Sequence, residues 1–349
     1  MNFIQHHTQY LDSLLPSTSG TDVYEIRIHD PFSIHKDFFC DVPSNTPVLI
    51  NQGYEEYDLV KLQDYHNIAP ENYTGIFADT PVGRVCTALE HAGIEQHMCH
   101  WASPDFYTKD RIPMDCNINF HYWDENKMQY LLCVGEVPSE DYNRDFEYRY
   151  AALNAGNHKN FYKIDFVYKL WLANLLDCGL VSLNNFEDTC PDPMLIEEYW
   201  LRFPDHFTDL LPFERDWNPN TEQQGTSDYN ELKNVKILAV TETLIESNYC
   251  YISPKTWRAI ACKKPFVVVG NRGLLKKLQD MGFITFSDYW DESYDELELH
   301  DRMDAVIEIL KQDPNLTGVE DILEHNYNLL VNTDWTQNLI SSIQCAIND

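Results

Sequence analysis

The sequence predicts an α/β protein built from parallel strands and the helices that connect them. Two observations carry this prediction. Apolar runs of four to eight residues recur along the chain between turn residues, and segments of helical length separate these runs. In the series from 235 to 286 the runs are mostly apolar, which is typical of strands buried on both faces of a parallel sheet.

The first half of the chain contains several such runs. A helix is predicted over residues 82–92 from its amphipathic pattern, and Gly93 follows it in the place of a C-terminal cap. The predicted strands cover residues 22–28, 47–51, 73–77, 97–101 and 128–134. We therefore expect an α/β domain in this half.

A polar stretch that contains a proline, VPSEDYNRD, predicts a domain boundary. We place an N-terminal domain at residues 1–145 and a C-terminal domain at residues 146–349. The second domain is expected to begin with a strand at 148–153 and a helix at 164–176. An irregular region rich in Pro, Asp and aromatic residues, about 184–234, is predicted to be an insertion.

The most legible series of elements runs from Val235 to Asp295. Ser253 and Pro254 predict the start of a helix, because serine is a favoured N-cap and proline fits the first helical position. The chain is expected to end in helices over residues 297–310 and 319–346. The predicted strands of the series cover residues 235–240, 265–270 and 283–286.

Polar side chains follow these strands where ligands bind in parallel sheets, outside the carboxyl ends. They are Glu242, Lys255, Asn271 and Arg272. Lys255 stands in the first turn of its helix, where the helix dipole disfavours a cation. Either an anion such as phosphate joins the lysine there, or the lysine is solvated at a cost of roughly a few tenths of a kcal/mol. The residues alone leave both interpretations open.

Composition predicts a globular chain with little affinity for other polyanions. The 349 residues include 56 acidic and 25 basic residues, which gives a formal net charge of −31. This charge disfavours nucleic acid and anionic membranes as partners, because no long basic run offsets it. Hydrophobic residues make up 44% of the chain, enough for a packed core.

Cysteine usage and the first residues predict a cytoplasmic protein. The ten cysteines form no Cys-x-x-Cys pair and no regular framework, so we expect reduced thiols. The beginning of the sequence, MNFIQHHTQYLDSLL, lacks the basic start and apolar core of a signal peptide. No apolar run has the length that a bilayer requires, so no membrane span is expected.

Three segments of the central series stand in a fixed order: Thr241-Glu242-Thr243, Tyr251-Ile252-Ser253-Pro254-Lys255 and Pro265-Phe266-Val267-Val268-Val269-Gly270. They resemble the donor-binding half of the family 10 glycosyltransferases, the α-1,3-fucosyltransferase type. That family has a strand, Phe-Glu-Asn-Ser, a loop, Tyr-hydrophobic-Thr-Glu-Lys, a helix and Pro-Val-Val-hydrophobic-Gly.

The resemblance is closer to relatives of this family from phages and large viruses. It continues through Leu275–Leu278, Gly282–Phe286 and Trp290–Asp295, so that it covers roughly sixty residues. Residues 148–182 resemble the same branch, with a strand, a loop, a helix and a Gly-Leu-hydrophobic-Ser end. In this second stretch Lys163 falls where the family has an arginine that contacts the donor pyrophosphate.

The resemblance implies two Rossmann-like domains in the GT-B arrangement, followed by C-terminal helices. It implies inverting, metal-independent transfer of a fucose-like sugar to a hydroxyl of a glycan or another acceptor. The donor is a nucleotide sugar, GDP-fucose by analogy. No metal or other cofactor is expected, in agreement with the absence of an Asp-x-Asp element from the sequence.

The site residues that the resemblance implies fall into two groups. A carboxylate of the N-terminal domain is expected to act as general base, and candidates at predicted strand ends are Asp79, Glu55 and Asp105. The expected donor-binding residues are Lys255, Lys163, Glu242, Thr243, Tyr251, Ser253, Asn271 and Arg272.

Three of these positions depart from the family pattern. Pro254 replaces the ribose-binding glutamate, Thr243 replaces an asparagine, and Lys163 replaces the arginine. A lysine offers phosphate a point charge without the two-pronged geometry of arginine. Two functions therefore stay open: an active glycosyltransferase, and a catalytically inactive protein of this fold with a binding or structural role in a virus.

Overall fold

The structure is a computed structural model of the chain, which divides into two compact units. Unit 1 holds Met1–Glu125, Ser247–Tyr251 and Asp334–Asp349, and unit 2 holds Asn126–Glu246 and Ile252–Thr333. The predicted domain boundary after residue 145 lies inside unit 2. The residues that the structure describes are 24–28, 42, 48–52, 81–103, 105–106, 119–122, 137–138, 140–154, 162–183, 201–208, 232–242, 245, 250–335, 338 and 341–342.

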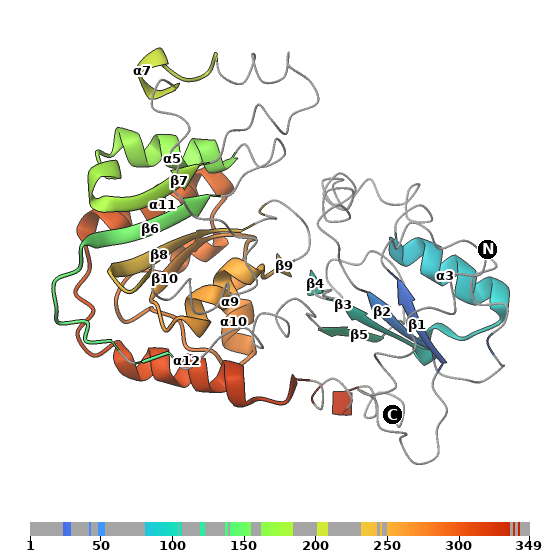
Figure 1. Cartoon of the computed structure of the whole chain (residues 1–349). Helices are drawn as coiled ribbons and strands as arrows, with labels where there is room; N and C mark the ends of the chain where they lie inside the picture. The colour runs from blue at the N-terminus through green and yellow to red at the C-terminus, as the bar shows by residue number, and fades with distance from the viewer. Residues whose placement is uncertain are drawn as a thin grey trace. The chain divides into compact units, whose positions relative to one another are not determined.

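The described part of unit 1 contains a parallel sheet of four strands in the order β1-β2-β3-β5 (Figure 1). The helix α3 (Pro81–Ala92) precedes β3 and buries an apolar face, as its pattern predicts. Gly93 ends it with a φ of +69°. The strands are β1 (Tyr24–Ile28), β2 (Val48–Gln52), β3 (Cys99–Ser103) and β5 (Asn119–Tyr122).

These elements confirm three of the five strands predicted in the first half, at 22–28, 47–51 and 97–101, each displaced by no more than two residues. The predicted strands at 73–77 and 128–134 lie outside the described residues. A short antiparallel pair also belongs to unit 1. It joins β4 (Asp105–Phe106) to β9 (Cys250–Tyr251).

Unit 2 is built around a second parallel sheet, whose strands lie in the order β10-β8-β6-β7. Along the chain, β6 is followed by β7, which lies on one side of it, whereas β8 and then β10 lie on the other side of β6. The direction of winding therefore reverses between β6 and β8, which is where open α/β sheets bind ligands. The strands are β6 (Tyr148–Asn154), β7 (Gly179–Leu183), β8 (Val235–Thr241) and β10 (Phe266–Val269).

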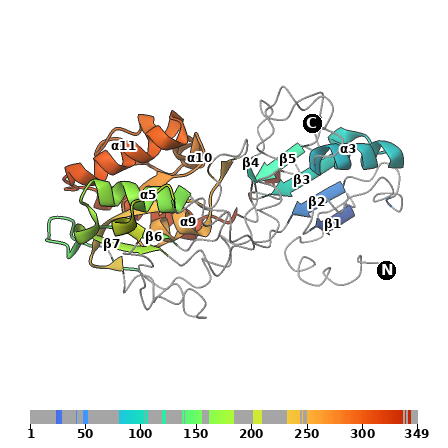
Figure 2. The ribbon, with the colours of Figure 1, turned by 90° about the horizontal axis from the view of Figure 1, so that it is seen from above.

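Helices cover both faces of this sheet (Figures 1 and 2). Because parallel crossovers are right-handed, connections that wind in opposite directions place α5 and α9 on opposite faces. The helix α11 contacts α5, and α12 contacts α9. The helices are α5 (Tyr162–Leu172), α7 (Asp205–Thr208), α9 (Pro254–Ala261), α10 (Leu274–Asp280), α11 (Leu299–Gln312) and α12 (Glu320–Asn332).

Two predictions for the end of the chain are wrong. Residues 283–286 form no strand, because side chains rather than a neighbouring strand satisfy their backbone: Asn326 bonds both the N–H and the carbonyl of Ile284, at 2.8 Å each. The helix predicted over 319–346 is interrupted, since α12 ends at Asn332 and Thr333 has an extended backbone. The helix predicted at 297–310 is confirmed by α11, two residues later at each end.

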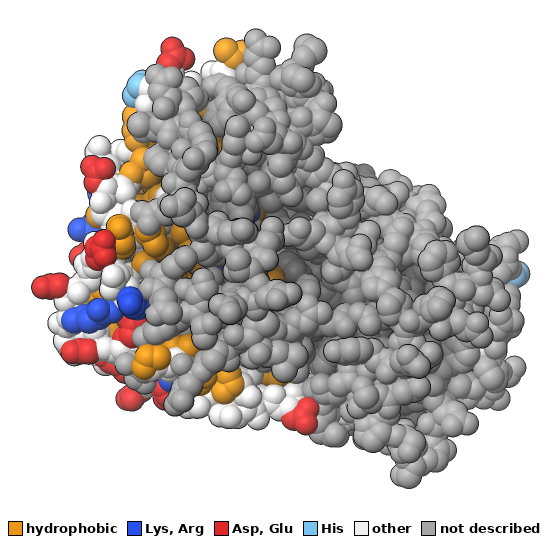
Figure 3. Space-filling model, viewed as in Figure 1, with side chains coloured by type: hydrophobic (Ala, Val, Ile, Leu, Met, Phe, Trp, Pro, Cys, Tyr) orange, Lys and Arg blue, Asp and Glu red, His pale blue; other side chains and the backbone are white. Residues whose placement is uncertain are grey.

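The described surface of unit 2 mixes charges of both signs (Figure 3). Several basic side chains pair with carboxylates there; Asp313, for example, lies 2.7 Å from Lys236 and 3.4 Å from Arg149. Such pairing keeps these cations from forming an uncompensated basic patch. Within the described ranges, no helix combines the length and the apolar character needed to cross a bilayer.

Candidate functional site at the start of α9

The first turn of α9 is organised by its cap. The Ser253 side chain accepts a hydrogen bond of 3.2 Å from the Lys255 backbone N–H, and Pro254 opens the helix. The helix therefore begins at Pro254 with Ser253 as its N-cap, which confirms the predicted helix start. Lys255 stands at the carboxyl edge of the sheet, next to the strand-order reversal, as expected for a ligand-binding position.

Glu242 follows β8 directly and is fully buried. One carboxylate oxygen accepts a bond of 3.1 Å from the Ser253 backbone N–H, and the other accepts one from the Thr256 hydroxyl. The carboxylate therefore satisfies donors at the N-terminus of α9, where the helix dipole favours negative charge. Sequence reasoning expected a donor contact from Glu242, but the structure places both of its oxygens against the protein.

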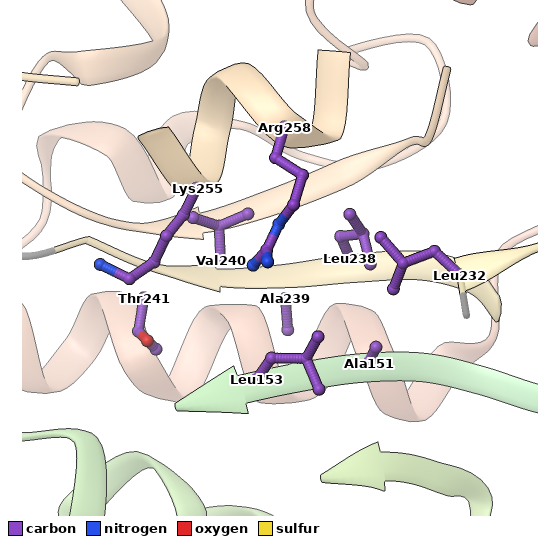
Figure 4. A pocket seen from close by; sticks show the side chains of 9 residues that line it. All are labelled: Ala151, Leu153, Leu232, Leu238, Ala239, Val240, Thr241, Lys255 and Arg258. Atoms are coloured by element: carbon purple, nitrogen blue, oxygen red, sulfur yellow. The ribbon is translucent and has the colours of Figure 1, made fainter. Parts of the chain in front are cut away.

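A hollow lies beside α9 on the face of the sheet (Figure 4). Lys255 and Arg258 extend from the helix toward β8, above an apolar floor that includes Leu153 and Val240. The hollow holds about 290 Å³, including space open to solvent.

Arg258 was missed by the sequence analysis. It lies three residues after Lys255, and residues at this spacing share one face of a helix. That spacing was the available signal. The lining residues of the hollow are Ala151, Leu153, Leu232, Leu238, Ala239, Val240, Thr241, Lys255 and Arg258.

The start of α5 lies beside the same edge of the sheet. The Tyr162 hydroxyl donates a hydrogen bond to the backbone carbonyl of Glu242. Burial, reinforced by the charge of Glu242, raises the pKa of Tyr162 well above its ordinary value, so the phenol keeps its proton and acts as a donor. Lys163, the next residue, is 1% exposed and is not among the residues that line the hollow. The structure thus brings together the two helix starts that carry Lys163 and Lys255.

The end of β10 is arranged differently. Asn271 is buried, and the exposed Arg272 forms an ion pair with Glu298. The first turn of α10 is capped by Asp295, whose two oxygens accept bonds of 3.2 Å from the N–H groups of Leu275 and Lys276. Neither Asn271 nor Arg272 lines the hollow beside α9.

Two buried side chains, those of Arg302 and Asp295, bind backbone groups at the end of β10 and at the start of α10. Arg302 of α11 donates hydrogen bonds to the carbonyls of Gly270 and Leu297. Burial raises the pKa of Asp295, although its two N–H donors and the charge of Arg302 act in the opposite direction. The predicted donor-binding pair Asn271 and Arg272 therefore stands in an internally bonded region.

Of the remaining predicted residues, two are located by the backbone pairing of their strands, and the others lie outside the described residues. Asp105 and Tyr251 are direct partners in the antiparallel pair of β4 and β9 in unit 1. The structure thus brings a candidate base and a candidate donor-binding residue opposite each other along the backbone. Thr243 and the candidate bases Asp79 and Glu55 lie outside the described residues.

The chemistry available at the start of α9 is anion binding. Two cations above an apolar floor, next to a capped helix start, suit a phosphorylated ligand with an apolar portion. Among the described residues, no cluster of three or more His, Cys, Asp or Glu could hold a metal ion. The absence of a cofactor stays a prediction.

Comparisons with known proteins leave the geometry to carry the functional argument. No family model, curated protein or solved structure matches the chain.

Proposed function

We propose that this protein is a glycosyltransferase that binds the diphosphate of a nucleotide-sugar donor at the start of α9. The two units would correspond to the two Rossmann-like domains of a GT-B enzyme, and unit 2 would be the donor-binding one. GDP-fucose is the donor suggested by the resemblance to family 10 enzymes. The acceptor would be a hydroxyl group of a glycan or of another molecule.

The observation that carries the proposal is the placement of Lys255 and Arg258. Both line one hollow, at the sheet edge next to the reversal between β6 and β8. Lys255 also lies in the capped first turn of α9, and a helix N-terminus favours an anion beside it. The resembled motif also has a lysine at this helix start, which supports a donor-binding role for Lys255.

The proposed reaction is a single displacement at the anomeric carbon of the donor sugar. The acceptor oxygen forms a bond to this carbon while the bond from the carbon to the diphosphate oxygen breaks. The acceptor proton passes to a carboxylate base, and the electron pair of the broken bond leaves with the nucleoside diphosphate. Lys255 and Arg258 would stabilise the charge that develops on the leaving group.

The alternative is a catalytically inactive protein that keeps the fold and a binding site. Three predicted donor-binding residues favour this alternative, because they interact with the protein itself. Glu242 is hydrogen-bonded to α9, Arg272 is paired with Glu298, and Asn271 is buried. Such a protein would bind nucleoside diphosphate and would not consume the donor sugar.

Calorimetric titration with GDP, UDP, ADP and CDP, and with their sugar conjugates, tests the proposal. We expect saturable binding of one nucleotide by the wild type. Lys255→Ala and Arg258→Ala should each weaken it roughly 10- to 100-fold, because a hydrogen bond to a charged group contributes about 1.5–3 kcal/mol. Lys311→Ala is the matched control, since Lys311 is an exposed lysine of α11 that pairs with Glu308.

Three results would decide between the readings. Release of nucleoside diphosphate from one donor sugar in the presence of an acceptor supports the enzyme. Binding without any release, across a panel of glycan acceptors, supports the inactive alternative. If no nucleotide binds at millimolar concentration, the donor site and both readings that depend on it are wrong.

A further inference from the structure

We propose that Glu242 is a positioning residue that fixes the first turn of α9, and through it Lys255, without touching the ligand. The inference rests on the proposed function, because it assigns Glu242 a part in anion binding at the same site. It departs from the donor contact that the sequence predicted for this residue. Three observations support it: the hydrogen bonds of its carboxylate, the contacts that hold its backbone, and its complete burial.

The carboxylate holds α9 on both sides of Lys255. Ser253, which donates its backbone N–H to one oxygen, is two residues before Lys255, and Thr256, which donates its hydroxyl to the other, directly follows it. Ser253 in turn accepts the Lys255 backbone N–H. The backbone of Lys255 is therefore bracketed by two groups that the same carboxylate binds.

Two further elements hold the backbone of Glu242. Its backbone N–H donates to the Val269 carbonyl of β10 at 2.9 Å, and its carbonyl accepts from Tyr162 of α5. Gly270 leaves space for its side chain, because a Cβ at that position would lie 3.1 Å from the Glu242 Cγ atom. A residue whose backbone is fixed by β10 and α5 can hold the first turn of α9 in a defined position.

Complete burial separates this role from ligand contact. Glu242 has no exposed surface, whereas Lys255 is half-buried and lines the hollow. A buried carboxylate that receives two donors is stable where it stands, and moving it toward a ligand would leave both donors without their acceptor. The geometry assigns the ligand to Lys255 and Arg258 and assigns the positioning to Glu242.

The test compares Glu242→Gln with a matched variant elsewhere. Glutamine keeps the size of the side chain but loses its charge, and it presents an NH2 group in place of one acceptor oxygen. Asp295→Asn makes the corresponding change at α10, where the carboxylate also caps a first turn but does not bracket a residue of the hollow. A general loss of helix capping would affect both variants alike.

The first measurement is the dissociation constant for GDP, UDP and ADP by calorimetry. We expect Glu242→Gln to weaken binding of the preferred nucleotide about tenfold, and Asp295→Asn to leave it unchanged. In a Lys255→Ala background, Glu242→Gln should cause no further loss, because its effect acts through Lys255. Thr256→Val should weaken binding as Glu242→Gln does, and Thr256→Ser, which keeps the hydroxyl, should not.

The second measurement is hydrogen exchange of the Ser253 and Lys255 amides without ligand. Glu242→Gln should speed exchange of both amides relative to the wild type and leave the α10 amides unchanged. If Glu242→Gln does not fold, the two Thr256 variants carry both measurements. The exchange result stands even if no nucleotide binds the wild type, so a failure of the proposed function is distinguishable from a failure of this inference.

Three outcomes would overturn the inference. An additional tenfold loss when Glu242→Gln is added to Lys255→Ala would show that Glu242 contacts the ligand independently. Equal losses of affinity in Glu242→Gln and Asp295→Asn would show a nonspecific effect on the fold. Unchanged exchange of the Ser253 and Lys255 amides would show that the carboxylate does not order the first turn of α9.

Discussion

The starts of α9 and α10 make an instructive comparison, because both lie at the carboxyl edge of the same sheet. Each helix is preceded by a buried strand, and each first turn receives one buried carboxylate. Glu242 serves α9 from the end of β8, and Asp295 serves α10 from the segment that follows that helix. A buried carboxylate thus serves both helix starts, but Asp295 accepts two backbone N–H groups, whereas Glu242 accepts one backbone N–H and one hydroxyl.

The neighbouring cations differ. At α10, Arg272 pairs with Glu298, and Arg302 is buried against the carbonyls of Gly270 and Leu297. At α9, Lys255 and Arg258 line a hollow on the sheet. The difference teaches that capping alone does not make a helix start a binding site. The cations beside α10 bond to the protein itself, whereas those beside α9 line the hollow where we propose that the ligand binds.

The strongest way to break the comparison is to remove Arg302. Arg302→Ala takes a buried guanidinium away from two carbonyls and from the neighbourhood of Asp295, so we expect a loss of about 4 kcal/mol in the free energy of unfolding. Urea denaturation would measure it. Lys311→Ala, which removes an exposed cation of the same helix, should change stability by less than about 0.5 kcal/mol. A mild effect of Arg302→Ala would mean that the α10 edge is not closed by this side chain.

The two helix starts can also be compared by removing one cation at each and measuring both nucleotide affinity and stability. Lys255→Ala should weaken nucleotide binding roughly 10- to 100-fold and leave the free energy of unfolding within about 0.5 kcal/mol of the wild type. Arg272→Ala should leave both quantities nearly unchanged, because its ion pair with Glu298 is exposed. Calorimetry and urea denaturation on both variants test this. A large loss of affinity in Arg272→Ala would extend the binding site to the β10 edge.

The far end of α9 offers a pH-dependent test of how that helix is anchored. Lys264 follows the helix, is fully buried, and donates to Glu140 at 2.8 Å and to the Val235 carbonyl at 3.0 Å. Burial lowers the pKa of Lys264 to about 8, although Glu140 acts in the opposite direction. Below pH 8 both folded and unfolded chains hold this proton, and above it the unfolded chain holds the proton that the folded chain has released.

Stability should therefore rise with pH above 8, because the unfolded state binds more protons there. Between pH 8 and 9.5 we expect Lys264 to contribute a gain of about 1.5 kcal/mol in the free energy of unfolding. Lys264→Met should lack this gain, and urea denaturation at both pH values measures the difference between the two proteins. The same pH slope in Lys264→Met would contradict the assignment to this lysine.

The start of α9 could be predicted from sequence because its determinants are local. A serine, a proline and the strand before them specify where the helix begins, and the structure places the cap at Ser253. The same holds for α3, where Gly93 ends the helix in the left-handed region. Mainly apolar runs likewise predicted β8 and β10, because parallel strands are buried on both faces.

The remainder depended on contacts between segments that are distant in sequence. Residues 283–286 resemble a strand in composition, but the side chain of Asn326 satisfies the Ile284 backbone. Glu242 looked available to a ligand until the fold placed the N-terminus of α9 against its carboxylate. The pairing of Arg272 with Glu298 joins positions 26 residues apart, which no local pattern specifies.

The smallest effect tests whether the cap of α9 matters to binding as well as to the helix. Ser253→Ala removes the oxygen that accepts the Lys255 N–H and should lower the free energy of unfolding by about 1 kcal/mol. Because the cap fixes the turn that carries Lys255, nucleotide affinity should fall as well. Ser253→Thr, which keeps the hydroxyl acceptor, should retain most of the stability and of the affinity. Urea denaturation and calorimetry on both variants measure the two quantities. If Ser253→Ala lowers stability and leaves the nucleotide affinity unchanged, the cap does not position Lys255 for the ligand, and the contrast with α10 loses its functional meaning.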